Sequence, residues 1–250
     1  QVMCLSADFS ALKHITYGTA PISPDLLRRS IATFKCRFSQ LYGLTETTGP
    51  ITALRHEHHV GARLLSCGRP MIGGRMRVVD ADGKDLPAGE VGEILYQGES
   101  LMAGYWAREK ETAQAVRGGW LHTGDAAYMD EDGFIFLKDR LKDLIVSGGE
   151  NVYPAEVEAV LMGHPEILEC AVIGVPDPTW GETVKAVVVR RAGTSLTEAS
   201  LIDWSRDKLA GFKRPRSVDF IATLPRNASG KLVKRTLREP YWAGHSRRIN

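Results

Sequence analysis

The segment DRLKDLIVSGGENVYPAEVE, residues 139–158, decides how the chain is divided. Its charged beginning is followed by an apolar strand pattern, a Ser-Gly-Gly loop and a helix that opens with Pro154. Before it, residues 68–139 show short β-runs with turn signals, and after it strands and helices alternate. This change of pattern predicts a boundary between Asp139 and Lys142. The expected domains are residues 1–140 and 141–250.

The first domain is expected to begin with a strand at residues 12–20 and a helix at residues 23–34. Ser23 can cap that helix with Pro24 at its first position, and one face carries the apolar side chains. A loop rich in Thr and Gly is expected at 40–49. Two hairpin signals follow, in ADGKDLPAGE and around Asp132-Gly133.

The second domain is expected to be a small α+β unit of about 100 residues, a usual domain size. The apolar patterns predict strands and helices in alternation, ending in a basic helix. The whole chain is therefore placed in a multidomain α/β and α+β class. The expected elements are the strand 143–147, a helix from 154, the strands 170–175 and 183–189, the helix 196–209 and the strand 217–221.

Composition excludes several classes of function. The net charge of +2 gives no electrostatic case for a nucleic-acid partner, and no apolar stretch is long enough to span a bilayer. We therefore expect a protein of the cytoplasm with no integral membrane segment. The cysteines are scattered and predict neither a zinc ribbon nor a disulfide framework. They are Cys4, Cys36, Cys67 and Cys170.

Two segments of the first domain carry groups suited to a nucleotide. QLYGLTETTG (40–49) offers hydroxyls and backbone amides for a phosphate, and Glu46 can carry a magnesium ion. In GGWLHTGDAAYMDEDGF (118–134), Asp125 can accept two hydrogen bonds from a ribose diol. Taken singly, the first segment is better explained as a polar loop, and Asp125 as a turn-forming residue.

A segment across the predicted boundary, residues 137–161, and a segment of the second domain add cations and glycines. Arg140 can hold a ribose or phosphate, and the glycines at 148 and 149 let a slender ligand pass close to the backbone. In LPRNASGKLVKRTL (224–237), Lys231 follows Ser-Gly, but Pro225 and Leu232 exclude a Walker A loop. Singly, these are an ordinary turn and surface charges. The histidines of RHEHHV (55–60) lack metal-ligand spacing and are interpreted as a polar loop.

Together, in this order and spacing, the four segments resemble the superfamily of acyl-CoA synthetases, luciferases and peptide-synthetase adenylation domains. The resemblance covers essentially the whole chain, and SGGENVYPAEVE with PRNASGK is most similar to bacterial fatty-acid or aryl-acid CoA ligases. It implies the β-rich end of a large adenylate-forming domain followed by a small α+β lid. The further matching stretches are YGTAP (17–21), GRPMIG (68–73), GEILYQGESLMAGYW (92–106) and GVPDPTWGE (174–182).

The resemblance also implies a role for each matching residue. Tyr42 lies on or near the adenine, Thr45 contacts the α-phosphate and Glu46 helps to hold Mg²⁺. Asp125 binds the ribose, joined by Arg140. Lys231 bridges the α-phosphate and the attacking carboxylate and is the expected catalytic residue.

Members of the same family have a small domain that swings like a lid, and the resemblance places its hinge at Lys142. Lys231 is needed for adenylate formation, and the lid then presents another face to the CoA thiol. The implied CoA contacts are Gly148, Gly149, Trp180, Phe212 and Arg214. The implied substrates are ATP, CoA and a small carboxylic acid, and no covalent enzyme intermediate is implied.

The family's phosphate loop with its own lysine does not occur in these 250 residues. Because the chain also begins at Gln1, we expect a piece of a longer enzyme, with negligible ATP–pyrophosphate exchange by itself. An adenylation domain serving a carrier protein and a non-catalytic nucleotide- or CoA-binding fragment stay open as alternatives. A nucleic-acid module is disfavoured because the basic residues 226–238 lack interleaved aromatics. The acid and the oligomeric state, including a homodimer, are not decided.

Overall fold

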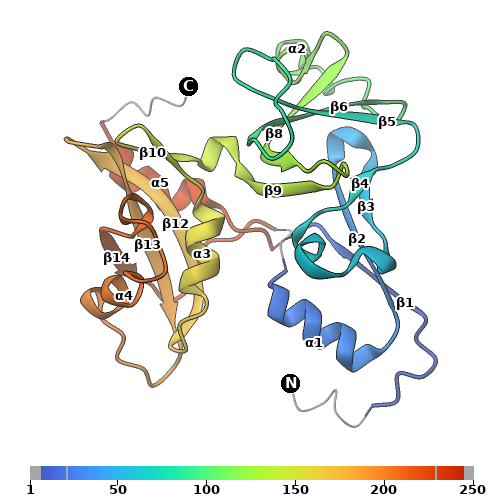
Figure 1. The fold of residues 1–250 in the computed structure, drawn as a ribbon. Helices are drawn as coiled ribbons and strands as arrows, with labels where there is room; N and C mark the ends of the chain where they lie inside the picture. The colour runs from blue at the N-terminus through green and yellow to red at the C-terminus, as the bar shows by residue number, and fades with distance from the viewer. Residues whose placement is uncertain (1–6, 21, 229, 245–250) are drawn as a thin grey trace. The chain divides into compact units, whose positions relative to one another are not determined.

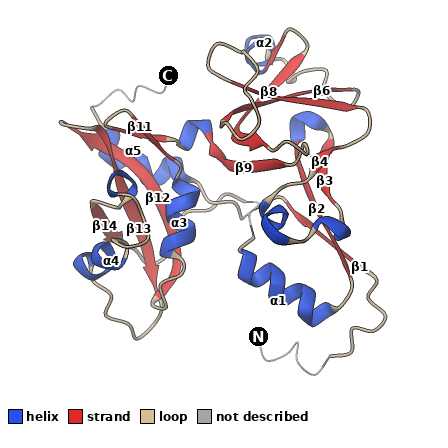
Figure 2. Ribbon diagram, in the orientation of Figure 1, coloured by secondary structure: helices blue, strands red, loops and turns tan. Residues whose placement is uncertain are grey.

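The computed structural model describes residues 7–20, 22–228 and 230–244, in which the chain forms two compact units (Figure 1). The first unit comprises Gln1–Leu137 and the second Lys138–Asn250. Both mix helices with sheets, as the sequence predicts, and strands dominate the first unit (Figure 2).

One sheet of the first unit has four strands in the order β1-β2-β3-β4. β1 pairs with β2 in parallel, and α1 provides the crossover between them. The expected capping is confirmed, because the Ser23 hydroxyl accepts a hydrogen bond from the Leu26 N–H at 3.2 Å. Leu27 on this helix is 1% exposed and packs with Phe38 of β2. The elements are β1 (His14–Gly18), α1 (Pro24–Phe34), β2 (Arg37–Leu44), β3 (Gly49–Leu54) and β4 (Arg69–Pro70).

The second sheet of this unit has the order β5-β6-β8-β7, and β9 pairs with β8. Both hairpin signals are confirmed, since β5 pairs antiparallel with β6 and the Asp132-Gly133 turn joins β8 to β9. A short helix, α2, precedes β7 and was not expected. The elements are β5 (Gly74–Val79), β6 (Gly92–Gly98), α2 (Glu109–Ala115), β7 (Val116–Arg117), β8 (Trp120–Met129) and β9 (Ile135–Arg140).

The prediction of a loop at residues 40–49 is wrong for most of its length. β2 extends to Leu44, and a single 3-10 turn at Thr45–Thr47 leads directly into β3. The Thr47 hydroxyl closes the turn, because it accepts from the Leu44 N–H at 3.0 Å and donates to the Gly49 carbonyl at 2.7 Å. Local hydrogen bonding thus lets a polar stretch continue the sheet.

The second unit contains a five-stranded sheet with the order β11-β10-β13-β12 and β14 parallel to β13. Its core lies on both faces of β12 and β13, which explains their continuous apolar sequences. α3 and α4 pack on one face and α5 on the other (Figure 1). The strands are β10 (Ile145–Ser147), β11 (Glu150–Val152), β12 (Ile167–Asp177), β13 (Gly181–Arg190) and β14 (Ser217–Phe220). The helices are α3 (Pro154–Leu161), α4 (Glu198–Trp204) and α5 (Lys234–Trp242).

Two details of the second unit differ from expectation. The Gly148-Gly149 pair does not lead into a helix but forms the two-residue turn of the β10–β11 hairpin, with φ angles of 61° and 86°. Positive φ at both positions is what a tight hairpin turn requires of glycine. α4 is also shorter than expected, since it ends at Trp204 and the chain continues as turns over residues 205–208.

Within the described residues, none of the helices combines the length and apolarity needed to cross a bilayer.

The buried face of α3 gives a stability prediction. Leu161 is 0% exposed in the core, whereas Leu168 at the start of β12 is 48% exposed. Leu161→Ala should lower the free energy of unfolding by about 2–5 kcal/mol, since it leaves a cavity, and Leu168→Ala should change it by less than about 0.5 kcal/mol. Urea denaturation followed by circular dichroism measures both. Equal costs would contradict the described packing of α3.

Candidate active site

Tyr42 and Asp125, 83 residues apart in sequence, meet between the two sheets of the first unit. The Tyr42 hydroxyl donates to Asp125 Oδ2 at 2.6 Å. Asp125 is only 7% exposed, and the Tyr42 ring packs in two apolar clusters that include Ile94 and Ile51. The pair therefore brings a buried carboxylate and an aromatic ring together at a site where the sequence predicts adenosine contacts.

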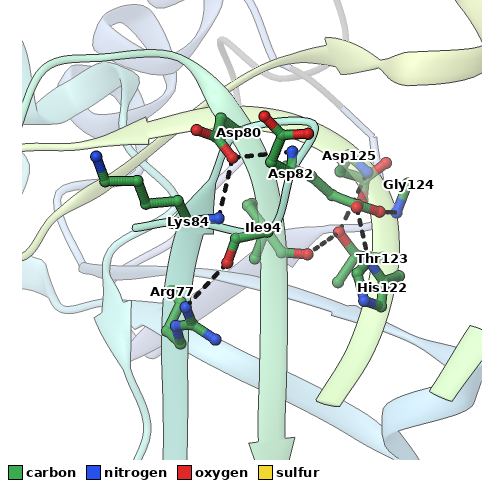
Figure 3. Close-up of polar contacts among 11 residues, drawn as sticks. Arg77, Asp80, Asp82, Lys84, Ile94, His122, Thr123, Gly124 and Asp125 are labelled. Atoms are coloured by element: carbon green, nitrogen blue, oxygen red, sulfur yellow. Dashed lines mark hydrogen bonds and ion pairs between the residues drawn. The ribbon is translucent and has the colours of Figure 1, made fainter. Parts of the chain in front are cut away.

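The Thr-Gly turn expected before Asp125 is instead part of strand β8, at an irregular step in its pairing with β6, and hydrogen bonds hold it there (Figure 3). The Thr123 hydroxyl donates to the Ile94 carbonyl at 2.8 Å and accepts from the Asp125 N–H at 3.1 Å. Glu93 accepts from the Gly124 N–H at 3.0 Å and contacts His122 Nδ1 at 2.8 Å. Sequence reasoning missed Glu93, although it lies in the quoted stretch GEILYQ.

The turn after β2 carries Thr45 and Glu46. Thr45 is exposed and Glu46 partly buried. The Tyr105 hydroxyl donates to Glu46 Oε1 at 2.7 Å, and the Glu46 carbonyl accepts from the Met102 N–H at 2.8 Å. The bond to Glu46 is the main cause that raises the pKa of Tyr105 to about 12. Glu46 therefore presents an oriented carboxylate, and Tyr105 is a second group missed from sequence.

In the second unit, Arg140 and Lys142 flank the start of a 3-10 turn at Leu141–Asp143. Both side chains are exposed, and the Arg140 N–H donates to Asp139 Oδ1 at 2.7 Å. The Lys142 carbonyl accepts from Arg238 of α5 at 3.3 Å. The turn therefore has a defined conformation and a link to the last helix.

Lys231 lies on a narrow hairpin just before α5. Its N–H donates to Asn227 Oδ1 at 2.9 Å, and its carbonyl accepts from the Asn227 N–H at 2.9 Å. Gly230, with φ of 78°, adopts a left-handed conformation that favours glycine. The hairpin projects an exposed lysine from a fixed backbone. Ser229 of the same motif lies outside the described residues.

The residues expected to contact CoA fall into two neighbouring groups of contacts. The Gly148 N–H donates to the Trp180 carbonyl at 2.9 Å, and a Cβ at Gly148 would lie 2.6 Å from the indole. The Arg216 guanidinium lies 5.1 Å from the Trp180 ring centroid. Arg216 belongs to the basic cluster at 213–216 and links Trp180 to the second group.

That second group surrounds a surface cavity of about 420 Å³. Arg214 and Arg216 both line it, and Arg214 Nε donates to the Leu209 carbonyl at 2.9 Å. Phe212 is partly buried against the apolar core beneath. The cavity thus offers cations beside apolar surface, as an anionic ligand with an aromatic base requires. Its lining comprises Ile202, Arg206, Gly211, Arg214, Pro215 and Arg216.

The histidine-rich stretch gives no metal centre. His56 Nδ1 accepts from the Phe38 N–H at 3.2 Å, and His59 Nε2 lies 3.1 Å from the Tyr17 hydroxyl. No cluster of three His, Cys, Asp or Glu side chains suited to a metal occurs within the part of the chain that the structure describes.

Comparison with known families gives two matches. Residues 3–106 match the AMP-binding enzyme family, and residues 156–231 match the AMP-binding enzyme C-terminal domain. The first match contains Tyr42, Thr45 and Glu46, and the second contains Lys231.

Individual relatives support the same grouping. The chain is 44% identical to the fatty acid–acyl-carrier-protein ligase ScoC of Streptomyces coeruleorubidus, over 97% of this chain and 47% of the relative. It is 47% identical to the 2-succinylbenzoate–CoA ligase of Geobacillus kaustophilus, over 80% of this chain and 40% of the relative. The chain therefore spans about half the length of the curated relatives it matches.

A solved structure shows the same fold. The o-succinylbenzoate CoA synthetase (MenE) of Bacillus subtilis, in complex with its acyl-adenylate intermediate, superposes with a TM-score of 0.84 at 36% identity. The match covers 91% of this chain and 46% of that chain. The same enzyme was also solved in complex with ATP and a magnesium ion.

The burial of Tyr42 gives a pH prediction. Burial, the largest cause, and the neighbouring Asp125 raise the pKa of Tyr42 well above its ordinary value of 10.0. The difference in absorbance at 295 nm between wild type and Tyr42→Phe reports the ionisation of Tyr42. This difference should therefore stay constant up to about pH 11 in the folded state and show a transition near pH 10 in urea. Because the folded-state pKa is raised, the contribution of Tyr42 to stability is complete below pH 10 and declines above it. A folded-state transition near pH 10 would contradict the buried pair.

Proposed function

Because the chain belongs to the AMP-binding enzyme family, we propose that it is part of an enzyme that activates a carboxylic acid with ATP and transfers the acyl group to CoA. The observation that carries the proposal is the Tyr42–Asp125 pair at 2.6 Å, which lies in the same unit as the Thr45–Thr47 turn. In this proposal the first unit is the β-rich end of the large nucleotide-binding domain, and the second is the lid. ATP and CoA are metabolites of the cytoplasm, where we place the enzyme.

Asp125 and Tyr42 are proposed to bind adenosine. Oδ2 of Asp125 accepts from Tyr42, and a carboxylate has capacity for further bonds, so the same side chain can accept from ribose hydroxyls. The Tyr42 ring supplies an apolar surface for the adenine. Arg140 is proposed to add a donor to the ribose when the lid closes.

Thr45 and Glu46 are proposed to serve the phosphates. The Thr45 hydroxyl is exposed and can donate to the α-phosphate. Glu46 supplies the hard oxygen ligand that Mg²⁺ prefers, and Tyr105 holds that carboxylate in place, so the residues fit a magnesium ion bound together with substrate phosphates. When bound, the ion neutralises charge on the leaving pyrophosphate.

Lys231 is the proposed catalytic residue of the first step. The substrate carboxylate attacks the α-phosphorus of ATP, the bond to pyrophosphate breaks, and acyl-AMP forms. The ammonium group stabilises the charge that accumulates on the α-phosphate. In the second step the CoA thiol loses its proton and attacks the acyl carbon, and AMP leaves. No bond to the protein forms in either step.

The two reaction steps need different groups in the site, and this favours a lid that moves between them. Lys231 must occupy the site during adenylate formation and leave it when the thiol enters, so we assign the pivot to Lys142. The Gly148-Gly149 turn, beside Trp180, is proposed to line the path of the pantetheine. Phe212 and Arg214, with the cavity beside them, are proposed to bind the CoA nucleotide.

A carrier protein is the second candidate for the thiol. The relative ScoC is named as a ligase of an acyl-carrier protein, so the acceptor is not common to the relatives. We favour free CoA because Arg214 and Arg216 line one cavity suited to the phosphates of a nucleotide. If calorimetry shows that the chain binds AMP or CoA, but fusions that supply the missing part turn over no substrate, the chain would instead be a non-catalytic binding module.

The adenylation step can be tested in a fusion. The part of the B. subtilis o-succinylbenzoate CoA synthetase that this chain does not match is joined to residues 1–250, and ATP–pyrophosphate exchange is measured with o-succinylbenzoate. Lys231→Ala should lower the rate by about 10²–10³-fold, as expected for a preorganised cation in a transition state. Lys208→Ala, an exposed lysine of the same unit, is the control. A fusion that folds but lacks exchange, or equal effects of both variants, would count against the proposal.

The thiol step gives a separate prediction. In the same fusion, Arg214→Ala should raise the KM for CoA by about tenfold, the loss of one charge-assisted contact, and leave pyrophosphate exchange unchanged. Arg191→Ala, at an exposed position after β13, is the matched control. Wild-type product formation with a phosphopantetheinylated carrier but none with CoA would establish the second candidate instead.

A further inference from the structure

We propose that Arg238 is a positioning residue that fixes the Leu141–Asp143 turn to helix α5, so that this turn and the Lys231 hairpin move as one body. All of the contacts involved lie within the second unit. The significance for catalysis rests on the proposed function, which assigns the pivot to Lys142 and the mobile cation to Lys231.

The link is a shielded ion pair with a second bond to the backbone. Arg238 Nη1 lies 2.7 Å from Asp143 Oδ1, and each side chain is only 12% exposed. The same nitrogen donates to the Lys142 carbonyl at 3.3 Å. One guanidinium therefore holds both a side chain and the main chain of the turn. Removing one member of such a pair leaves the other charge poorly solvated, which makes the contact hard to break.

Helix α5 is a firm base for this contact because it is tied to three other elements. At its first residue, Lys234 pairs with Glu158 of α3 at 2.8 Å. At its end, the Tyr241 hydroxyl donates to Asp219 of β14. Trp242 Nε1 also donates to the Gly174 carbonyl of β12 at 3.0 Å. Arg238 lies between these anchors, so it cannot follow the turn without moving the sheet.

The Lys231 hairpin is continuous with the same base. Leu232, directly after Lys231, and Leu237 on α5 pack against one apolar cluster that includes Ile173 and Val187. The Val233 N–H donates to the Pro225 carbonyl at 2.9 Å, which closes the hairpin just before the helix. The chain from Lys231 to Arg238 thus has no flexible joint, and a displacement of the turn is transmitted to the lysine.

This arrangement limits where the chain can bend. The Lys142 carbonyl and the Asp143 side chain are both bound by Arg238. The backbone rotations of a hinge therefore lie on the amino-terminal side of the Lys142 carbonyl. Arg238 sets that limit, although it is 96 residues away from Lys142 in sequence.

Residual dipolar couplings and amide hydrogen exchange on the 250-residue chain test the proposal. In wild type, couplings of residues 142–144, 226–228 and 230–233 should fit the alignment tensor of β12 and β13. Arg238→Gln should move the couplings of 142–144 away from that tensor and speed exchange of the Leu144 amide at least about tenfold, with β12 and β13 unchanged. Arg238→Lys, which keeps the charge, should return exchange to within about threefold of wild type.

Arg235→Gln is the matched control, since Arg235 on the same helix forms an exposed pair with Glu239. Unchanged couplings and exchange in Arg238→Gln would overturn the proposal, as would wild-type couplings of 142–144 that fit the first unit instead. None of these measurements needs turnover. A failure here is therefore separate from a failure of the proposed function, which pyrophosphate exchange tests.

Discussion

The hydrogen bond from Tyr42 to Asp125 joins two parts of the first unit that otherwise belong to different sheets. A carboxylate with 7% exposure is stable only with a donor, and the Tyr42 hydroxyl provides one. The Tyr42 ring in turn packs among apolar side chains from both sheets. The middle of β8 is thereby set against β2 two residues before its end, and the Thr45–Thr47 turn follows that end directly.

In the second unit, the buried core is distinct from the exposed groups that are proposed to take part in chemistry. β12 and β13 are apolar on both faces, and the helices that cover them are tied down by shielded ion pairs such as Arg238–Asp143. The groups proposed for chemistry are Lys231 and the Gly148-Gly149 turn. Both remain exposed on tight hairpins at the surface of the second unit. The proposed lid, presenting two faces in turn, would need this combination of a stiff body and exposed functional groups.

Much of the fold follows from local patterns in the sequence. Ser23 and Pro24 predict the start of α1, and the apolar runs predict β12 and β13. The β10–β11 hairpin was missed because Glu150 and Asn151 are exposed and show no apolar alternation. The end of α4 was missed because no Gly or Pro directly follows Trp204 to mark it, although the chain continues there as turns.

The site residues show a similar limit. Motifs identify Asp125, Glu46 and Lys231 one by one, but no local pattern predicts that Tyr42 bonds Asp125 or that Tyr105 bonds Glu46. These partners are 83 and 59 residues apart, and only tertiary packing selects them. Sequence therefore supplies candidate groups, whereas the structure supplies the contacts that orient them.

The central proposal is that the end of β2 and residues 123–125 of β8 form one adenosine site. The most direct measurement is a two-dimensional amide NMR titration of the chain with AMP at millimolar concentrations, in wild type and in Asp125→Ala. We expect shift changes concentrated at residues 42–46 and 123–126 that disappear in the variant. Shift changes confined to other residues, or unaffected by the variant, would contradict it.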